Sequence, residues 1–286
     1  MTSLSIIIPA KNEASGLMQL LPKLLSEYPD AEIIVVNDGS TDETHNIIQH
    51  NRVIEISHPY SKGNGAAIKS GVRAARGDIL AFMDADGQHR PEDLKALLKK
   101  MSTGYDMIVG ARAWGGQANV HRGLANTLYN QLASLIVGQP VSDLTSGMRV
   151  AKATLFREFL PLLPNGFSYP TTSTMAFFRA GYSVGYHPIS VTRREGPSHI
   201  RVVRDGLRFL IIIFKIGTLY SPLKIFVPLS ALFFMIATGY YGLTYYSTGR
   251  FTNMSALLYI TSMLIFLIGL VSEQITALTF IKSNDA

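Results

Sequence analysis

The chain has 286 residues, of which 47% are hydrophobic and 16% are charged, and it contains no cysteine. This apolar content excludes a disordered chain, and the lack of cysteine excludes a small fold held together by disulfides. The charge is uneven, because residues 1–200 carry 19 Lys and Arg against 17 Asp and Glu, whereas residues 201–286 carry 7 against 3. We therefore expect a balanced N-terminal domain and a basic, apolar C-terminal part.

The first residues and the basic surplus indicate where the chain works. The N-terminus has no basic segment ahead of an apolar run and reaches Pro9 and Lys11 at once, so we expect no signal peptide and a domain that folds in the cytoplasm. The net charge of +6 does not favour nucleic acid as a partner, because the surplus lies beside the apolar C-terminal part. Anionic lipid head groups are the expected partner of these basic residues.

The first 110 residues alternate short β-branched runs with amphipathic segments, which is typical of βαβ units on a largely parallel sheet. Ser40 or Thr41 is expected to cap a helix after the second strand, and Pro91 fits the first turn of another. In such an open α/β sheet, ligands bind beyond the carboxyl ends of the strands. The predicted strands are Leu4–Ile8, Glu32–Asn37, Val53–Ser57, Ile79–Asp84 and Met107–Gly110.

The pattern becomes Gly-rich and polar between Ala113 and Pro170, which predicts loops that carry a site. A further strand is predicted from Ser183 to Thr192. We expect the catalytic domain to occupy residues 1–200.

The C-terminal part is expected to lie on and in a membrane. Basic residues recur on one face of residues 201–222, which predicts an amphipathic interfacial helix. Two runs without charge then predict transmembrane helices at about 225–248 and 253–281, within residues 223–286, since about 20 apolar residues cross the hydrocarbon core. The alternative is a helical hairpin buried in a soluble core.

The basic residues also predict the orientation of this hairpin. They flank its open end, whereas Arg250 stands alone at its tip, so the positive-inside rule places both termini and the catalytic domain on the cytoplasmic side of the cell membrane. The sequence leaves open whether hairpins from several copies associate.

An apolar strand runs directly into two carboxylates, Asp84 and Asp86. In an extended chain this spacing puts both side chains on one face, so they can approach one hard cation, Mg²⁺ or Mn²⁺, with positions left for phosphate oxygens. The Asp-x-Asp pattern also occurs in ordinary turns. Its place at the end of a buried strand favours a metal role.

Four motifs occur in the order and spacing of the inverting GT-A glycosyltransferases of family 2, which the chain resembles over about its first 115 residues. The element Ser146–Arg149, the segment Arg193–Arg201 and the C-terminal hairpin make it similar, within that family, to the polyprenyl-phosphate sugar synthases related to dolichol-phosphate mannose synthase. The resemblance implies a GT-A fold, an open and mostly parallel sheet. The four motifs are Ser5–Glu13, Val35–Asp42, Lys62–Gly65 and Asp84–Asp86.

The resemblance also implies roles for individual residues. Asp38 would accept a hydrogen bond from the base, although its place before Gly39 also suits an Asx-turn. Lys62 precedes glycines that do not complete a dinucleotide fingerprint, because Ile68 replaces the third glycine. The implied nucleotide-binding residues are Pro9, Ala10, Glu13, Asp38, Lys62, Asp84 and Ala85, and the implied metal ligands are Asp84, Asp86 and Gln88.

A lipid phosphate acceptor would need cations, and arginine suits it because the guanidinium fork binds two oxygens. The candidates for this contact are Arg112, Arg149, Arg193, Arg194, Ser198 and Arg201, while the family's usual Lys is His199 here. Asp143 aligns approximately with a proposed general base of related enzymes. A phosphate monoester is already largely deprotonated at neutral pH, so we expect Asp143 to orient other groups. Asp86, Asp143 and Arg149 are the predicted catalytic residues.

The resulting hypothesis is a metal-dependent glycosyltransferase. It would move one hexose, from a donor of the UDP-glucose or GDP-mannose type, to polyprenyl phosphate at the cytoplasmic face of the membrane. Two alternatives stay open: a family 2 enzyme with another lipid or glycan acceptor, and a noncatalytic, membrane-tethered protein that binds nucleotide sugars.

Overall fold

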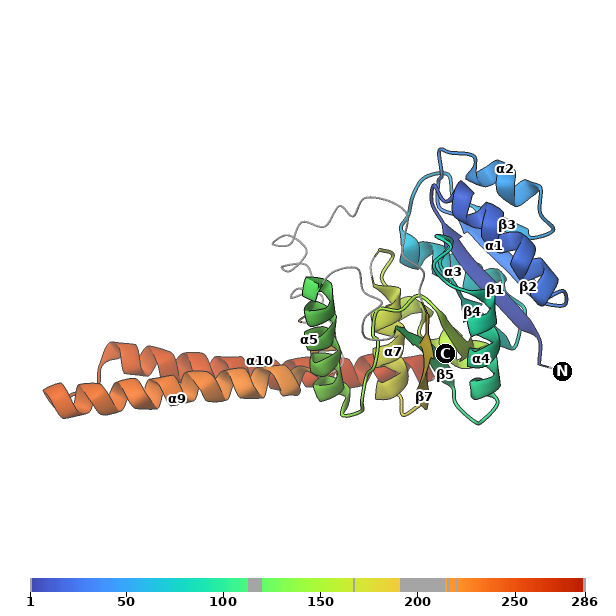
Figure 1. Cartoon of the computed structure of the whole chain (residues 1–286). Helices are drawn as coiled ribbons and strands as arrows, with labels where there is room; N and C mark the ends of the chain where they lie inside the picture. Colours follow the sequence, from blue (N-terminus) through green and yellow to red (C-terminus); the bar gives the residue numbers. More distant parts are fainter. Residues whose placement is uncertain are drawn as a thin grey trace. The chain divides into compact units, whose positions relative to one another are not determined.

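A computed structural model describes residues 2–112, 120–166, 168–190, 214, 217–219 and 221–284 of the chain (Figure 1). The chain separates into two compact units, Met1–His199 and Ile200–Ala286. Each unit is described by itself. The greater part of the predicted interfacial helix, residues 201–222, lies outside the described residues.

The first unit is built on a seven-stranded sheet in the order β3-β2-β1-β4-β6-β5-β7. Strands β1 to β4 are parallel to one another, β7 is parallel to β5, and β6 runs antiparallel to both of its neighbours. The strands are β1 (Leu4–Ala10), β2 (Glu32–Asn37), β3 (Ile54–Ser57), β4 (Ile79–Phe82), β5 (Met107–Arg112), β6 (Arg149–Lys152) and β7 (Val184–Ile189).

Helices cover both faces of this sheet. Successive strand residues point to opposite faces, so apolar side chains on both faces need a helix to pack against. Ile6 and Ile8 of β1 join the buried leucines of α1 and α4 in one core. Ile7 points the other way and lies against Gly71 of α3, where a side chain would not fit. The helices of this unit are α1 (Ala14–Glu27), α2 (Thr44–Gln49), α3 (Asn64–Ala74), α4 (Pro91–Met101), α5 (Val120–Val137), α6 (Ala153–Glu158), the 3-10 turn η1 (Leu160–Leu162) and α7 (Tyr169–Arg179).

The prediction of loops between Ala113 and Pro170 is wrong for most of that stretch. It contains α5, β6, α6, η1 and the start of α7. Strand β6 is only four residues long and begins with a buried arginine, Arg149, so it lacks the alternating apolar pattern of a strand. Helix α7 buries four consecutive hydroxyl side chains, Thr171 to Thr174, ahead of the apolar residues 175–177, and its first turn is capped by Ser168.

The second unit is a hairpin of two long apolar helices, α9 (Pro222–Thr248) and α10 (Asn253–Asn284), which Figure 1 shows running side by side. Small buried residues recur every seventh position of α10, at Ser255, Ser262, Gly269 and Thr276, and two of them, Ser262 and Gly269, contact α9. By length and composition, both helices are able to cross a membrane, with mean hydropathies of 1.7 and 2.3.

Polar contacts join the two helices of the hairpin, among them a hydrogen bond from Tyr259 Oη to Thr238 Oγ1. Ser230 and Ser262 each donate a hydroxyl hydrogen bond to the other's backbone carbonyl, both at 2.9 Å. Further along, the carboxylate of Glu273 accepts a hydrogen bond of 3.4 Å from the backbone N–H of Leu223 in the first turn of α9. The one acidic side chain of the predicted spans therefore caps a helix end, where a negative charge is favourable.

Candidate active site

The carboxyl ends of β1, β2 and β4 surround a hollow of about 430 Å³, which we call the donor hollow. Its place at the end of parallel strands is where an open α/β sheet binds ligands. Of the predicted site residues, the structure brings together at this hollow Pro9, Ala10, Glu13, Asp38, Asp84, Ala85 and Asp86. Lys62 and Gln88 are not among its lining residues.

Asn12 ties together two of the loops that form this hollow. It has a φ of 55°, a left-handed conformation that asparagine tolerates better than most side chains. Its side-chain Oδ1 accepts a hydrogen bond from the backbone N–H of Thr41, and its own N–H donates to Ser40 Oγ. The predicted helix cap by Ser40 or Thr41 is therefore wrong, since both residues bind Asn12 instead. Sequence reasoning missed Asn12, although its place in the first motif was a signal.

Asp38 organises the rim of the donor hollow. Its carboxylate accepts hydrogen bonds from Ser61 Oγ and from the backbone N–H groups of Lys62 and Gly63, and it pairs with His58 Nδ1 at 2.7 Å. Burial by itself raises the pKa of Asp38, but these hydrogen bonds outweigh it and lower the pKa to about 2. The carboxylate predicted to accept from the base is thus engaged by four protein donors, and it is Asn37 Oδ1 that accepts a local hydrogen bond, from the backbone N–H of Ser40.

The glycines after Lys62 serve close packing. A side chain on Gly63 would meet the carbonyl oxygen of Asn165, and one on Gly65 would overlap that of Pro164. The N-terminus of α3 can therefore approach the segment 163–166, whose carbonyls accept from its free N–H groups. The side chain of Lys62 is exposed and turns toward Tyr60, away from the donor hollow.

Asp84 and Asp86 lie together at the floor of the donor hollow. Burial raises the pKa of Asp84, whereas the charges of Arg112 and Arg149 act in the opposite direction. Gly147 packs directly on the Asp84 carboxylate, so no side chain fits at that position. His89 is buried, and its Nδ1 accepts a hydrogen bond of 3.2 Å from the backbone N–H of Asp84.

The residues at this floor fit a divalent cation that shares its ligands with a diphosphate. Two carboxylates two residues apart face one hollow, and hard cations prefer such oxygen ligands. Among the described residues no group of three or more His, Cys, Asp or Glu could hold a metal alone. The protein would therefore supply Asp84 and Asp86, and a donor would supply the remaining oxygens. Gln88 donates its backbone N–H to Asp86 Oδ1 and so shapes this turn.

Arg112 and Asp143 form a two-pronged ion pair close to Asp84. Arg112 Nε lies 2.7 Å from one carboxylate oxygen and its Nη2 lies 2.9 Å from the other. Burial by itself raises the pKa of Asp143, but the bonds from Arg112 outweigh it and hold the pKa below its usual value. Asp143 is therefore a weak base, and what it does in this structure is fix the guanidinium of Arg112.

Residues 5–160 match glycosyl transferase family 2, which covers more than half of the chain. The chain belongs to glycosyl transferase family 2. Residues 221–278 match the GtrB C-terminal hairpin. This match and the two apolar helices support association with a membrane.

Curated relatives of this family 2 protein include sugar transferases that act on undecaprenyl phosphate. The chain is 30% identical over 226 residues to the undecaprenyl-phosphate mannosyltransferase of Micrococcus luteus, covering 70% of this chain and 93% of that protein. It is 31% identical over 193 residues to an undecaprenyl-phosphate 4-deoxy-4-formamido-L-arabinose transferase of Pseudomonas fluorescens, and 30% identical over 215 residues to the hexosyltransferase Agl6 of Haloferax volcanii. These two matches cover 60% and 72% of this chain but only 56% and 52% of the relatives.

Solved structures share the fold. Glucosyl-3-phosphoglycerate synthase from Mycobacterium tuberculosis, bound to UDP, aligns with a TM-score of 0.60 and 21% identity, covering 76% of this chain and 80% of that one. Its complex with Mn²⁺ and UDP-glucose aligns with a TM-score of 0.57 and 22% identity, covering 74% and 77%. The predicted GT-A fold is confirmed.

Arg149 is placed differently from the expectation for this family 2 chain. Its side chain is fully buried, and Nη1 donates to Pro170 O, Ser173 Oγ and Thr174 Oγ1 at 2.8 to 3.0 Å. Burial lowers the pKa of its guanidinium. A lipid phosphate cannot reach this buried cation, so the structure does not support the predicted phosphate contact. Arg149 instead joins β6 to α7 through these hydrogen bonds, and its positive charge acts to lower the pKa of Asp84.

A second hollow, of about 710 Å³, is lined by Arg112 and is called the acceptor-side hollow here. It is formed by the end of β5, helix α5 and β7, and Asn130 and Tyr186 are among its lining residues. Arg112 thus lies beside this hollow and electrostatically close to Asp84 at the donor hollow. The remaining predicted acceptor residues, Arg193, Arg194, Ser198 and Arg201, lie outside the described residues.

Proposed function

We propose that the protein transfers one hexose from a nucleoside-diphosphate sugar to polyprenyl phosphate at the cytoplasmic face of a membrane. The observation that carries the proposal is that Arg112, which is fixed by Asp143, lines the second hollow and interacts electrostatically with Asp84, a carboxylate of the donor hollow. The family match and the undecaprenyl-phosphate transferases among the relatives support the same substrate classes.

The donor would occupy the hollow that contains Asp38, Asp84 and Asp86. A Mg²⁺ or Mn²⁺ ion held by Asp84 and Asp86 would neutralise charge on the departing diphosphate. The loop held by Asn12 shapes the wall that receives the nucleoside, with Pro9 and Glu13. The buried cation of Arg149 offsets the negative charge of Asp84 without touching the substrate.

Arg112 would hold the acceptor phosphate through Nη1, because its Nε and Nη2 bind Asp143 and Thr145 and so fix the guanidinium, which lines the acceptor-side hollow. A phosphate oxygen attacks the anomeric carbon in line with the leaving group. The new carbon–oxygen bond forms as the bond to the diphosphate breaks, and the nucleoside diphosphate leaves with that bond's electrons. The anomeric configuration inverts in this single step, and no covalent sugar–enzyme intermediate is formed.

The state of Asp143 disfavours transfer to a lipid hydroxyl. A hydroxyl must lose a proton during attack, which requires a general base with a pKa close to the working pH. Asp143 is paired with Arg112, and its pKa is lowered. A phosphate monoester needs no such base, because its second pKa is near 6.

The test is to incubate the purified chain with Mg²⁺ or Mn²⁺, polyprenyl phosphate and a panel of radiolabelled UDP- and GDP-sugars, and to extract the lipid. We expect label in the lipid with one donor, and none with the Asp84→Asn variant. Asp143→Asn should weaken transfer by misplacing Arg112. It should not shift the pH at which the transfer rate falls on the acid side. No labelled lipid with any donor, under conditions where donor binding is detected, contradicts the proposal.

A further inference from the structure

A basic hollow of about 460 Å³ lies beside the donor hollow, between the loop after β3, helix α3 and Asn165. Its lining includes three cations, Lys62, Lys69 and Arg73, and no carboxylate among the described residues. Hydroxyl groups from the same loop and from α3 also face it. None of the predicted roles except the nucleotide contact of Lys62 falls here.

The two cations on α3 face each other without a neutralising partner among the residues that the structure describes. Lys69 Nζ donates to Leu163 O at 3.1 Å and to the side chain of Asn165, which leaves one of its three N–H bonds for a ligand. Burial and, after it, the charge of Arg73 lower the pKa of Lys69. By contrast, Lys152 has Asp106 at 2.7 Å. An anion between Lys69 and Arg73 would relieve this repulsion.

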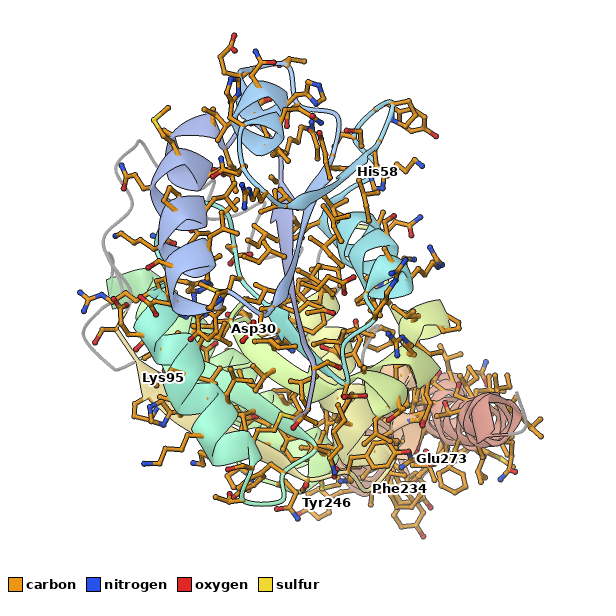
Figure 2. The ribbon with its side chains drawn as sticks, turned by 90° about the vertical axis from the view of Figure 1, so that its right-hand side faces the viewer. Asp30, His58, Lys95, Phe234, Tyr246 and Glu273 are labelled. Atoms are coloured by element: carbon orange, nitrogen blue, oxygen red, sulfur yellow. The ribbon has the colours of Figure 1, made fainter. Side chains whose placement is uncertain are left out.

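His58 connects the basic hollow to the donor hollow. It is buried, with Nδ1 2.7 Å from Asp38 Oδ1 and Nε2 2.9 Å from Ser70 Oγ. Asp38 lines the donor hollow and Ser70 lines the basic hollow. Figure 2 shows His58 in the loop region after β3, near α3. Ser61, whose hydroxyl donates to Asp38, lines both hollows.

We propose that the basic hollow binds a phosphate-type oxyanion and that its occupancy changes the affinity of the donor hollow for its nucleotide. The Arg73 fork and the Lys69 ammonium donate to the oxyanion, which hydroxyls of the hollow also reach. The response passes through the shared Ser61 and through the Ser70–His58–Asp38 chain. The anion is either free phosphate or the head group of a phosphate monoester lipid.

Binding is tested by titrating inorganic phosphate into the metal-free, full-length chain in detergent at constant ionic strength, followed by calorimetry. We expect saturable binding that Arg73→Gln weakens about tenfold, because the variant lacks the charged hydrogen-bond donor. Lys69→Gln, which retains a donor for Leu163 O, should weaken it similarly. The matched control is Lys95→Gln, which removes an exposed cation on α4 (Figure 2) and should leave binding unchanged.

A second experiment distinguishes free phosphate from a lipid head group. It compares the wild type with Arg73→Gln in nanodiscs of phosphatidylcholine with and without phosphatidic acid. Phosphate binding in detergent that depends on Arg73 identifies a soluble anion. Arg73-dependent protection of the hollow from hydrogen exchange, seen only with phosphatidic acid, identifies the lipid head group. If the wild type and Arg73→Gln behave alike in both experiments, the site does not exist.

The coupling rests on the proposed donor function, whereas the anion titration does not. We expect phosphate to change the dissociation constant of the cognate nucleoside diphosphate, measured with Mg²⁺, by about fivefold or more. Ser70→Ala breaks the link to His58 and should reduce this response while phosphate still binds. A nucleotide affinity that is indifferent to phosphate overturns the coupling, and absent nucleotide binding would instead count against the donor site.

Discussion

At the scale of single residues, Gly147 is the position where Asp84 meets the Ser146–Arg149 motif. Its backbone packs on the Asp84 carboxylate so closely that an added Cβ would overlap the oxygens. Sequence resemblance pointed to the arginine of this motif as the functional residue. The structure points to the glycine, because it sets the position of a carboxylate at the floor of the donor hollow.

Gly147→Ala should therefore displace Asp84 and reduce donor affinity and transfer at least tenfold, while costing about 1–3 kcal/mol of stability, as overpacking does. Donor binding by calorimetry and lipid labelling measure this. Gly166→Ala is the control, since nothing lies within 4 Å of its added Cβ. Donor affinity equal to that of the wild type in Gly147→Ala would show that Asp84 tolerates the shift.

Asp38 should make the free energy of unfolding of the catalytic unit depend on pH in the acid range. Its folded pKa of about 2 lies below the ordinary value of 3.8, so its contribution is complete above about pH 4 and is lost as the pH falls through about 2. The shift corresponds to about 2 kcal/mol.

The difference in unfolding free energy between the wild type and Asp38→Asn should accordingly narrow by about 2 kcal/mol between pH 5 and pH 2, measured by denaturant unfolding of the full chain in detergent. Asp30→Asn, which removes an exposed carboxylate (Figure 2), should show no such narrowing. A constant difference across this range would mean that the hydrogen bonds to Asp38 do not favour its charged form.

The roles of other residues could be anticipated only in part. Asp84 and Asp86 follow a strand with a clear apolar pattern, so their shared position was predictable. Arg112 and Asp143 are 31 residues apart, and they meet because β6 pairs antiparallel with β5. No local sequence pattern predicts this pair. The burial of Arg149 also depends on helix α7, whose polar composition hid it.

At the scale of elements, the parallel strands were predictable because β1 and β2 carry continuous β-branched runs and β4 and β5 carry short apolar runs. Strand β6 and helix α7 were not, since hydroxyls and a buried cation replace the apolar pattern there. Both elements act on the site through Arg149 and do not line the donor hollow. Their polar groups satisfy Arg149, which places positive charge near Asp84.

The hairpin offers a prediction at this scale. A Cβ added to Gly269 would lie 2.6 Å from Phe226 Cβ, so Gly269→Ala should separate α9 from α10 locally and lower the thermal stability of the helical signal in detergent. Gly239→Ala is the matched control on α9, where an added Cβ meets nothing within 4 Å. Equal melting of the two variants would show that close packing at Gly269 does not hold the hairpin.

At the scale of the whole molecule, the uneven charge predicts the orientation in the membrane. The chain lacks cysteine, so single cysteines can report it. Ser247→Cys at the hairpin tip should react with a membrane-impermeant maleimide in intact cells, whereas Ser102→Cys in the catalytic unit should react only after permeabilisation. The opposite pattern would place the catalytic unit outside.

The central claim is that the acceptor is a phosphate oxygen held by a pre-positioned arginine. The most direct measurement compares polyprenyl phosphate with the unphosphorylated polyprenol as acceptors for the cognate labelled donor, with the product's linkage determined by mass spectrometry and NMR. We expect a hexosyl phosphodiester with inverted anomeric configuration from polyprenyl phosphate, and no product from polyprenol. Comparable transfer to polyprenol, or retention of configuration, would contradict it.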